Sequence, residues 1–171
     1  MRIINLIVVH CSATREDCIL SPEDLDRLHR RRGFNGTGYH YYIRKDGTVH
    51  LTRPVERIGA HAKGFNAHSI GICYEGGLDC RGRPADTRTP EQRAALRLLV
   101  HQLLEKFPDC RVCGHRDLSP DKNGNGEIEP EEWMKACPCF DAEEEFKELV
   151  AEGTVETQSK LNYLKNEKGG K

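Results

Sequence analysis

The stretch RIINLIVVHCSA, residues 2–13, contains the first apolar segment of the chain and places a histidine directly after it. Ile3 to Val9 is rich in β-branched residues and is interrupted only by Asn5, a pattern typical of a strand buried on both faces of a sheet. The run is too short to cross a membrane and leads straight into the fold, so we expect a core strand and no export signal. His10 then falls at the carboxyl end of this strand, where open α/β sheets place their chemistry.

Strong helix signals follow this strand. Ser21 as N-cap and Pro22 at the first helical position predict a helix that ends at Gly33, with Leu25 and Leu28 facing the core. A second helix is predicted over residues 89–108, where a capping box precedes one apolar stripe. The box is Thr89 with Gln92, and the stripe is Leu96, Leu99, Leu103 and Leu104. A final helix is predicted over residues 141–153.

The remaining segments read as strands and loops. Residues 39–54 predict a β-hairpin, because Asp46-Gly47 can supply the positive backbone angles of a tight turn. Residues 69–77 predict an apolar strand closed by two glycines, followed by a surface loop over 78–88. Residues 110–115 predict a short strand that delivers His115. Strands that alternate with helices in this way predict an α/β fold, a single domain with a central mixed β-sheet flanked by helices.

Composition narrows the class of function. The 171 residues fit one domain, which we place at 1–150, followed by a polar tail at 151–171. The formal net charge of −1 gives no reason to expect nucleic acid or a membrane surface as a partner, and the sequence does not decide on a protein partner. Without an export signal, the eight cysteines are expected to be reduced thiols, metal ligands or buried apolar residues.

Five motifs occur in order along the chain: VVHCSAT, GYHYYIRKDGTV, HAKGFNAHSIGI, GHRDLSP and KACPCFD. Together they resemble the zinc-dependent N-acetylmuramoyl-L-alanine amidases of the bacteriophage lysozyme type, whose fold is shared with peptidoglycan recognition proteins. The resemblance runs from about Arg2 to Asp141. It implies hydrolysis of the amide between N-acetylmuramic acid and L-alanine in peptidoglycan, by a phage- or prophage-type lysis enzyme. Such an enzyme is cytoplasmic as synthesised and acts on the cell wall after release.

Carried over by motif, the resemblance implies three zinc ligands, His10, His115 and Cys137, and two catalytic residues, Tyr39 and Lys135. Zinc in hydrolases keeps a fourth position for water and lowers the pKa of that water to roughly 7. The lysine can then stabilise an oxyanion, and the tyrosine can hydrogen-bond the water or the departing nitrogen.

Other interpretations remain open from the residues alone. A single histidine at a strand end is commonly structural. Tyr39 could be a half-buried aromatic residue of the sheet, and Lys135 a solvent-exposed charge. The alternative function is a non-catalytic peptidoglycan-binding module. His61 and Asn66, in HAKGFN, are candidate groove residues for the muramyl peptide. Four cysteines could instead build a structural zinc site: Cys110, Cys113, Cys137 and Cys139.

A long insertion separates two of the expected zinc ligands, since His115 and Cys137 lie twenty-two positions apart. Its residues 121–132, DKNGNGEIEPEE, match the twelve-residue calcium loop pattern. The candidate calcium ligands are Asp121, Asn123, Asn125, Glu127 through its carbonyl, and Glu132. No helix is expected before this loop and no second loop pairs with it. We expect PEEWMKA, residues 130–136, to form the exiting helix, and a calcium ion to order the segment that carries Lys135 and Cys137.

Overall fold

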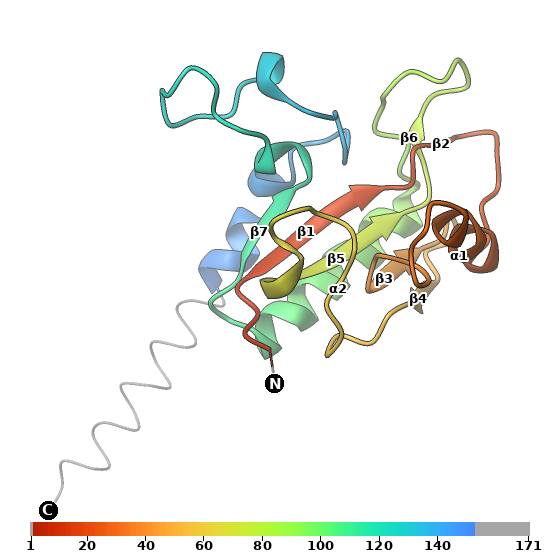
Figure 1. Ribbon diagram of the computed structural model, residues 1–171, viewed down its shortest axis with the longest axis horizontal. Coiled ribbons are helices and arrows are strands. Elements are labelled where there is room, and N and C mark those ends of the chain that lie inside the picture. The colour runs from red at the N-terminus through yellow and green to blue at the C-terminus, as the bar shows by residue number, and fades with distance from the viewer. Residues whose placement is uncertain (1, 153–171) are drawn as a thin grey trace, which may run out of the picture.

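The computed structural model describes residues 2–152 and places β1 (Leu6–Cys11), which is buried along its whole length, inside a five-stranded sheet (Figure 1). The strand order is β4-β3-β5-β1-β7. β1 runs parallel to both of its neighbours, β5 (Ser69–Tyr74) and β7 (Arg111–Gly114). β3 (Tyr41–Ile43) is also parallel to β5, whereas the edge strand β4 (Val49–Leu51) is antiparallel to β3. The predicted mixed sheet is confirmed.

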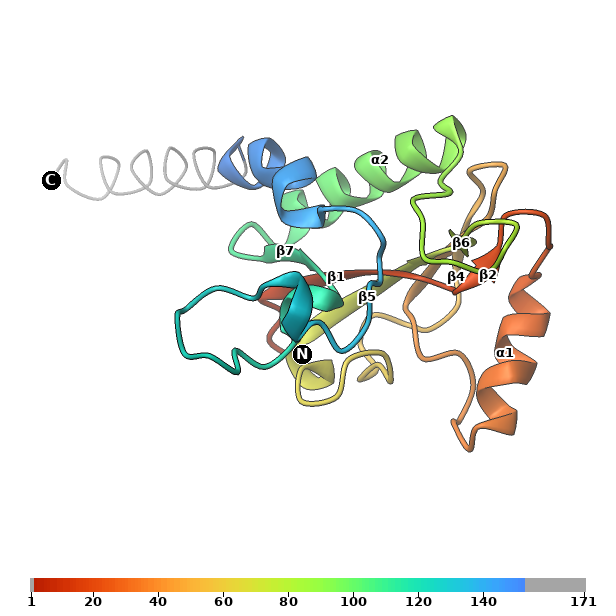
Figure 2. The same ribbon diagram turned by 90° about the horizontal axis from the view of Figure 1, so that it is seen from above.

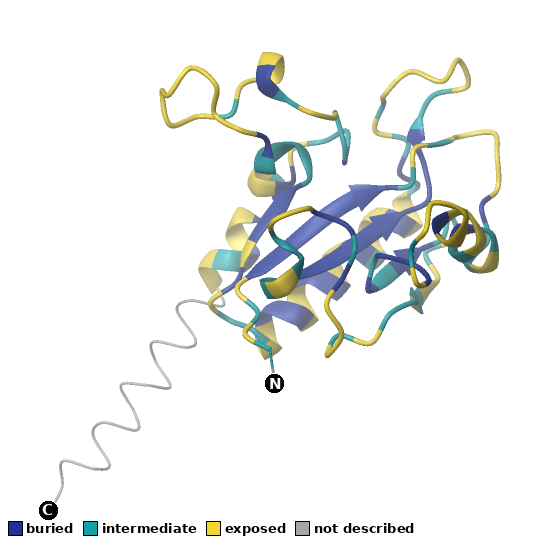
Figure 3. Cartoon of the chain, viewed as in Figure 1, coloured by how far each residue is buried: buried dark blue, intermediate teal, exposed yellow. Residues whose placement is uncertain are grey.

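The two faces of the sheet bury different sets of residues. Ile7 and Val9 pack in the largest core cluster with the leucines of α2 (Pro90–Lys106), whereas Leu6 and Val8 lie in a separate cluster. Successive side chains of a strand point to opposite faces, so His10 lies on the face away from α2. In Figure 2, α2 and the last helix cover one side of the sheet, and Figure 3 shows the buried central strands between the layers.

The helices begin where the sequence predicts. The Ser21 hydroxyl accepts a hydrogen bond from the Asp24 N–H at 3.1 Å, at the start of α1 (Pro22–Arg31). α2 has its predicted capping box and buries its predicted leucine stripe. Residues 142–152 are helical, and the Asp141 carboxylate accepts the Glu144 N–H at 3.0 Å. The rest of the predicted tail, 153–171, lies outside the described residues.

Two local predictions, one in α1 and one in the hairpin, are wrong. Leu28 is 45% exposed, because His29, four positions after Leu25, takes the inward position instead. Its Nδ1 accepts the Gly38 N–H at 2.9 Å, a bond that a leucine could not make. In the hairpin, only Gly47 has a positive φ (+82°), and Asp46 does not. The Arg44 N–H donates to the Thr48 carbonyl, so the turn is a three-residue loop over 45–47 with Gly47 in the left-handed position.

Short elements complete the described chain. β2 (Thr14–Arg15) pairs in parallel with β6 (Gly77–Leu78), which opens the predicted loop over 78–88. Three 3₁₀ turns are also described: η1 (Asn66–His68) directly before β5, η2 (Arg116–Leu118) after β7, and η3 (Pro130–Glu132) within the insertion. Within residues 2–152, no helix combines the length and the apolar character needed to cross a bilayer.

Candidate metal centre and groove

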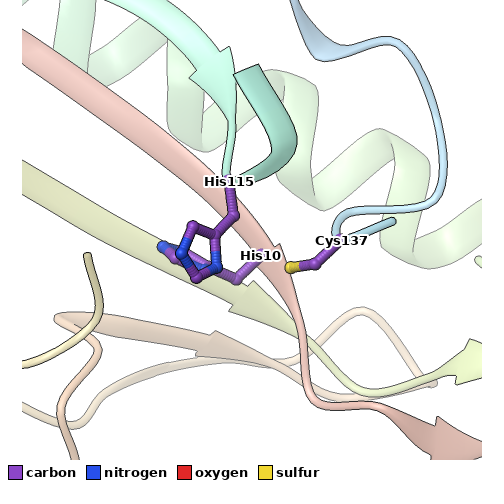
Figure 4. Close-up of side chains that lie close together, drawn as sticks. All are labelled: His10, His115 and Cys137. Carbon is purple, nitrogen blue, oxygen red and sulfur yellow. The ribbon is translucent and has the colours of Figure 1, made fainter. Parts of the chain in front are cut away.

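Three side chains from distant parts of the sequence meet at the carboxyl end of the sheet (Figure 4). His10, His115 and Cys137 each place one ligand atom within 4.8 Å of the others. Over the part of the chain that the structure describes, no other group of three histidine, cysteine or acidic side chains comes this close. The three residues are those that the motifs predict as zinc ligands.

The sheet register explains why the two histidines meet. Val9 of β1 lies opposite Gly114 of β7, so the residues that come next in the chain, His10 and His115, lie at the same edge of the sheet. The His115 N–H donates to the Val9 carbonyl at 3.1 Å, and the two imidazole centroids are 4.7 Å apart. Two parallel strands therefore fix the separation of these ligands without help from the loops.

Cys137 is held to the same edge by backbone hydrogen bonds. The Arg116 N–H donates to the Cys137 carbonyl at 2.8 Å, and the Cys11 N–H donates to the Cys137 sulfur at 3.2 Å. The following residue, Pro138, packs on Gly114, where an added Cβ would lie 2.4 Å from the proline Cδ. Glycine is therefore required at position 114 for the cysteine segment to approach β7.

The protonation of the cluster suits a metal ion. Burial lowers the pKa of His10 well below its usual value, and His61, His115 and Lys135 lower it further. Burial and the charge of Lys135 also lower the pKa of His115. Neutral imidazole nitrogens and one sulfur fit Zn²⁺, which takes such ligands at about 2.0–2.3 Å in tetrahedral sites. Three protein ligands leave a fourth position for a water or a substrate.

A groove of about 750 Å³ opens over these ligands. Tyr39 and Lys135, the two expected catalytic residues, both line it together with His115 and Cys137. The Tyr39 ring lies 5.1 Å from the His10 ring, and burial raises the pKa of its hydroxyl well above 10, so it stays protonated and can donate a hydrogen bond. Lys135 is exposed at the rim.

His61 and Asn66 also line the groove, but their contacts are with the protein. His61 is only 9% exposed, and its Nδ1 lies 3.0 Å from Nε2 of His10. The Asn66 side-chain oxygen accepts the N–H groups of His61 and Ala62, both at 2.9 Å. Contact with a muramyl peptide stays a prediction for both residues.

Four lining residues carry no functional signal of their own in the sequence, although Lys63 lies within the motif HAKGFNAHSIGI. Arg32 and Phe34 come from the end of α1, Lys63 from the loop before η1, and Met134 from the segment before Cys137. Arginines at the end of a helix are favoured by the helix dipole, so Arg32 gave no functional signal in the sequence. Only the fold brings these four side chains to one groove.

The family model described as N-acetylmuramoyl-L-alanine amidase matches residues 1–139. The chain belongs to this amidase family. It is 36% identical over 144 residues to the endolysin of Enterobacteria phage K11, covering 83% of this chain and 86% of the relative. It is likewise 36% identical over 146 residues to the endolysin of Escherichia phage T7, covering 84% and 87%.

Solved structures agree with this assignment to the amidase family. N-acetylmuramoyl-L-alanine amidase LysC from Clostridium intestinale URNW superposes with a TM-score of 0.63 at 30% identity. The superposition covers 87% of this chain and 84% of that one. The expected family and fold are therefore both confirmed.

The insertion of this amidase-family chain folds into a loop held by its own side chains. The Asp121 carboxylate accepts the N–H groups of Gly124 and Gly126, at 2.6 and 2.9 Å. The side-chain oxygen of Asn123 accepts the Asn125 N–H, and that of Asn125 accepts the Glu127 N–H. Calcium binding by these residues stays a prediction.

Glu132 closes the loop from its far end. Its carboxylate accepts three backbone N–H groups, those of Lys122, Asn123 and Glu129. The predicted exiting helix over residues 130–136 is wrong, because only η3 forms. Trp133 leaves the helical region with ψ of 123°, and the Met134 N–H donates to the Ser119 hydroxyl at 3.0 Å rather than to a helical carbonyl.

The four-cysteine zinc site does not form. Cys110 and Cys113 are both fully buried, and they belong to separate core clusters. Neither takes part in a group of metal ligands within residues 2–152. Both act as small apolar residues of the core, the third of the interpretations that the sequence allows.

Proposed function

We propose that this chain is a zinc-dependent N-acetylmuramoyl-L-alanine amidase that cleaves peptidoglycan between the lactyl group of N-acetylmuramic acid and L-alanine of the stem peptide. The observation that carries the proposal is the meeting of His10, His115 and Cys137 beneath a groove that Tyr39 and Lys135 line. A lysis role at the cell wall is part of the proposal, and the similarity to phage endolysins supports it.

Each residue has a distinct task in this reaction. His10, His115 and Cys137 hold the zinc ion, which when bound supplies a Lewis acid and water activation at neutral pH. Lys135 stabilises negative charge that develops on the carbonyl oxygen, which is worth on the order of a hundred- to a thousandfold in rate for one such donor. Tyr39 donates a hydrogen bond from its protonated hydroxyl to the departing nitrogen.

The charge of the groove supports a peptide substrate with free carboxylates. Arg32, Lys63 and Lys135 line it, and none of the lining residues is aspartate or glutamate. This differs from the chain as a whole, in which 27 acidic residues balance 26 basic ones. Complementary charge favours the approach and orientation of an anionic stem peptide.

The complete set of ligands and catalytic side chains argues against the alternative of a binding module without activity. A module of that kind needs the groove but has no use for a lysine and a tyrosine beside three metal ligands. A separate part of the proposal is a structural calcium ion in residues 121–132, which the match to the twelve-residue pattern supports.

Metal content and product identity test the proposal together. Zinc is measured by elemental analysis in wild type, Cys137→Ser and the control Cys80→Ser, which replaces an exposed cysteine. The same samples digest peptidoglycan, and free stem peptides that begin with L-alanine are sought by mass spectrometry. We expect near-stoichiometric zinc and such peptides from wild type and Cys80→Ser, and neither from Cys137→Ser. Zinc that survives in Cys137→Ser would contradict the ligand set.

A further inference from the structure

His61 links the metal ligand His10 to the neighbouring strand. Its Nδ1 lies 3.0 Å from Nε2 of His10, and its Nε2 lies 3.3 Å from the hydroxyl of Ser69, the first residue of β5. His10 and His61 are both buried. The three side chains therefore form one continuous hydrogen-bonded row across the face of the sheet.

Only one arrangement of protons satisfies this row when His10 binds a metal. Because Nε2 of His10 faces His61, Nδ1 is the atom left for the metal, and the ring proton resides on Nε2. That N–H donates to Nδ1 of His61, whose own proton must then lie on Nε2 and point to the Ser69 hydroxyl. The hydrogen bond of the second ring thus decides which nitrogen of the first ring is the ligand.

Two glycines leave the space that the His61 ring occupies. An added Cβ at Gly71 would lie 2.6 Å from Cγ of His61, and one at Gly59 would lie 2.5 Å from its Cδ2. The Asn66 oxygen fixes the backbone at His61 and Ala62. Two glycines and one asparagine therefore hold the ring in a single place against His10.

We propose that His61 is a positioning residue of the metal centre, which fixes the tautomer and orientation of His10 instead of contacting the peptide. The inference deepens the proposed function and rests on it for the role of His10. It reassigns a residue that the sequence suggested as part of the peptide groove.

Metal affinity of the full chain tests this role without any substrate. Cobalt(II) is titrated into metal-free protein, its visible absorption is followed, and zinc affinity is measured by competition with a chelator. Loss of a residue that orients a metal ligand costs typically 10- to 100-fold in affinity, which we expect for His61→Ala. His61→Asn keeps an acceptor at the position of Nδ1 and should recover most of that loss. His101→Ala removes a half-exposed histidine of α2 and should match wild type.

Kinetics separate positioning from peptide binding. At saturating zinc, His61→Ala should lower kcat and leave KM unchanged, and its cobalt spectrum should differ from that of wild type. Unchanged metal affinity with a raised KM would overturn the inference and return His61 to the peptide groove. Equal losses in His61→Ala and His61→Asn would also overturn it, because a purely structural role gives no rescue by asparagine.

The inference and the proposed function fail in different ways. If wild type releases no stem peptides but its cobalt affinity still depends on His61, the amidase proposal fails and the positioning role stands. If wild type is an active amidase whose metal affinity is indifferent to His61, the reverse holds.

Discussion

Arg88 ties the last described helix to the segment that follows Cys137, and its loss should destabilise the whole domain. Its side chain is fully buried and donates two hydrogen bonds to Asp86 at 2.9 Å and two to Glu145 at 2.8 Å. Its guanidinium also lies 3.3 Å from the centre of the Phe140 ring. One side chain thus joins the loop before α2, the helix over 142–152 and the cysteine segment.

The size of the effect follows from what Arg88→Ala leaves behind. Breaking a buried ion pair from one side costs about 3–5 kcal/mol, because an uncompensated charge remains. The side chains of Asp86 and Glu145 are 24% and 30% exposed, so water stabilises the carboxylates that Arg88→Ala leaves unpaired. We therefore expect the lower end of that range of energies. A loss of about 3 kcal/mol lowers the Tm of a domain of this size by roughly 6–12 °C.

Thermal unfolding of the metal-free chain, followed by circular dichroism, measures this loss. Arg93→Ala is the matched control, because Arg93 also pairs with Asp86 but its side chain is 47% exposed, and such pairs contribute less than about 1 kcal/mol. If Arg88→Ala melts within about 2 °C of wild type, or if both variants lose the same stability, the reasoning from buried charge is wrong.

Three further predictions concern the site, the acid response and the insertion. Lys135→Ala should lower kcat on the order of a hundred- to a thousandfold while elemental analysis finds its zinc content unchanged, and loss of zinc would show a structural role instead. Burial lowers the pKa of His40 to about 4, so the stabilisation from its neutral form is present above the unfolded pKa of 6.5 and is lost as the pH falls toward 4. When the pH is lowered from about 7.5 to 5, the free energy of unfolding measured in urea should fall by about 2 kcal/mol less for His40→Gln than for wild type. Equal decreases in the two proteins would contradict this. Calcium titrated into the zinc-loaded chain should give binding heat by calorimetry that Asp121→Ala abolishes, and heat that survives the change would exclude the loop as its source.

The fold could be predicted where local signals agree with burial. β1 is a run of β-branched residues between polar ends, and α2 has a capping box followed by a regular leucine stripe. Prediction failed where a tertiary hydrogen bond decided the outcome. His29 rather than Leu28 faces inward, because its ring accepts the Gly38 N–H. Residues 133–136 are not helical, because the Met134 N–H donates to the Ser119 hydroxyl.

The site was predictable to a different degree for each residue. His10 and His115 lie at the carboxyl ends of two strands, so their approach could be expected from strand order, whereas Cys137 needed the resemblance to a known family. The contact of His61 with His10 spans 51 positions and follows no periodicity, so no local pattern could reveal it. Arg32 lies in no motif, and the motif HAKGFNAHSIGI assigns no role to its Lys63, so only the fold reveals that both cations line the groove.

The hydrogen bond between the Arg116 N–H and the Cys137 carbonyl has a consequence for protein engineering. It joins the two ends of the insertion at an N···O distance of 2.8 Å, beside the metal ligands. The entropy of closing such a loop grows slowly with its length, by about 0.6 kcal/mol for each doubling. Because this bond lies outside residues 121–132, we expect that foreign peptides, such as wall-targeting sequences, can be grafted into the loop with loss of the proposed calcium site but not of the hydrogen bond that places Cys137.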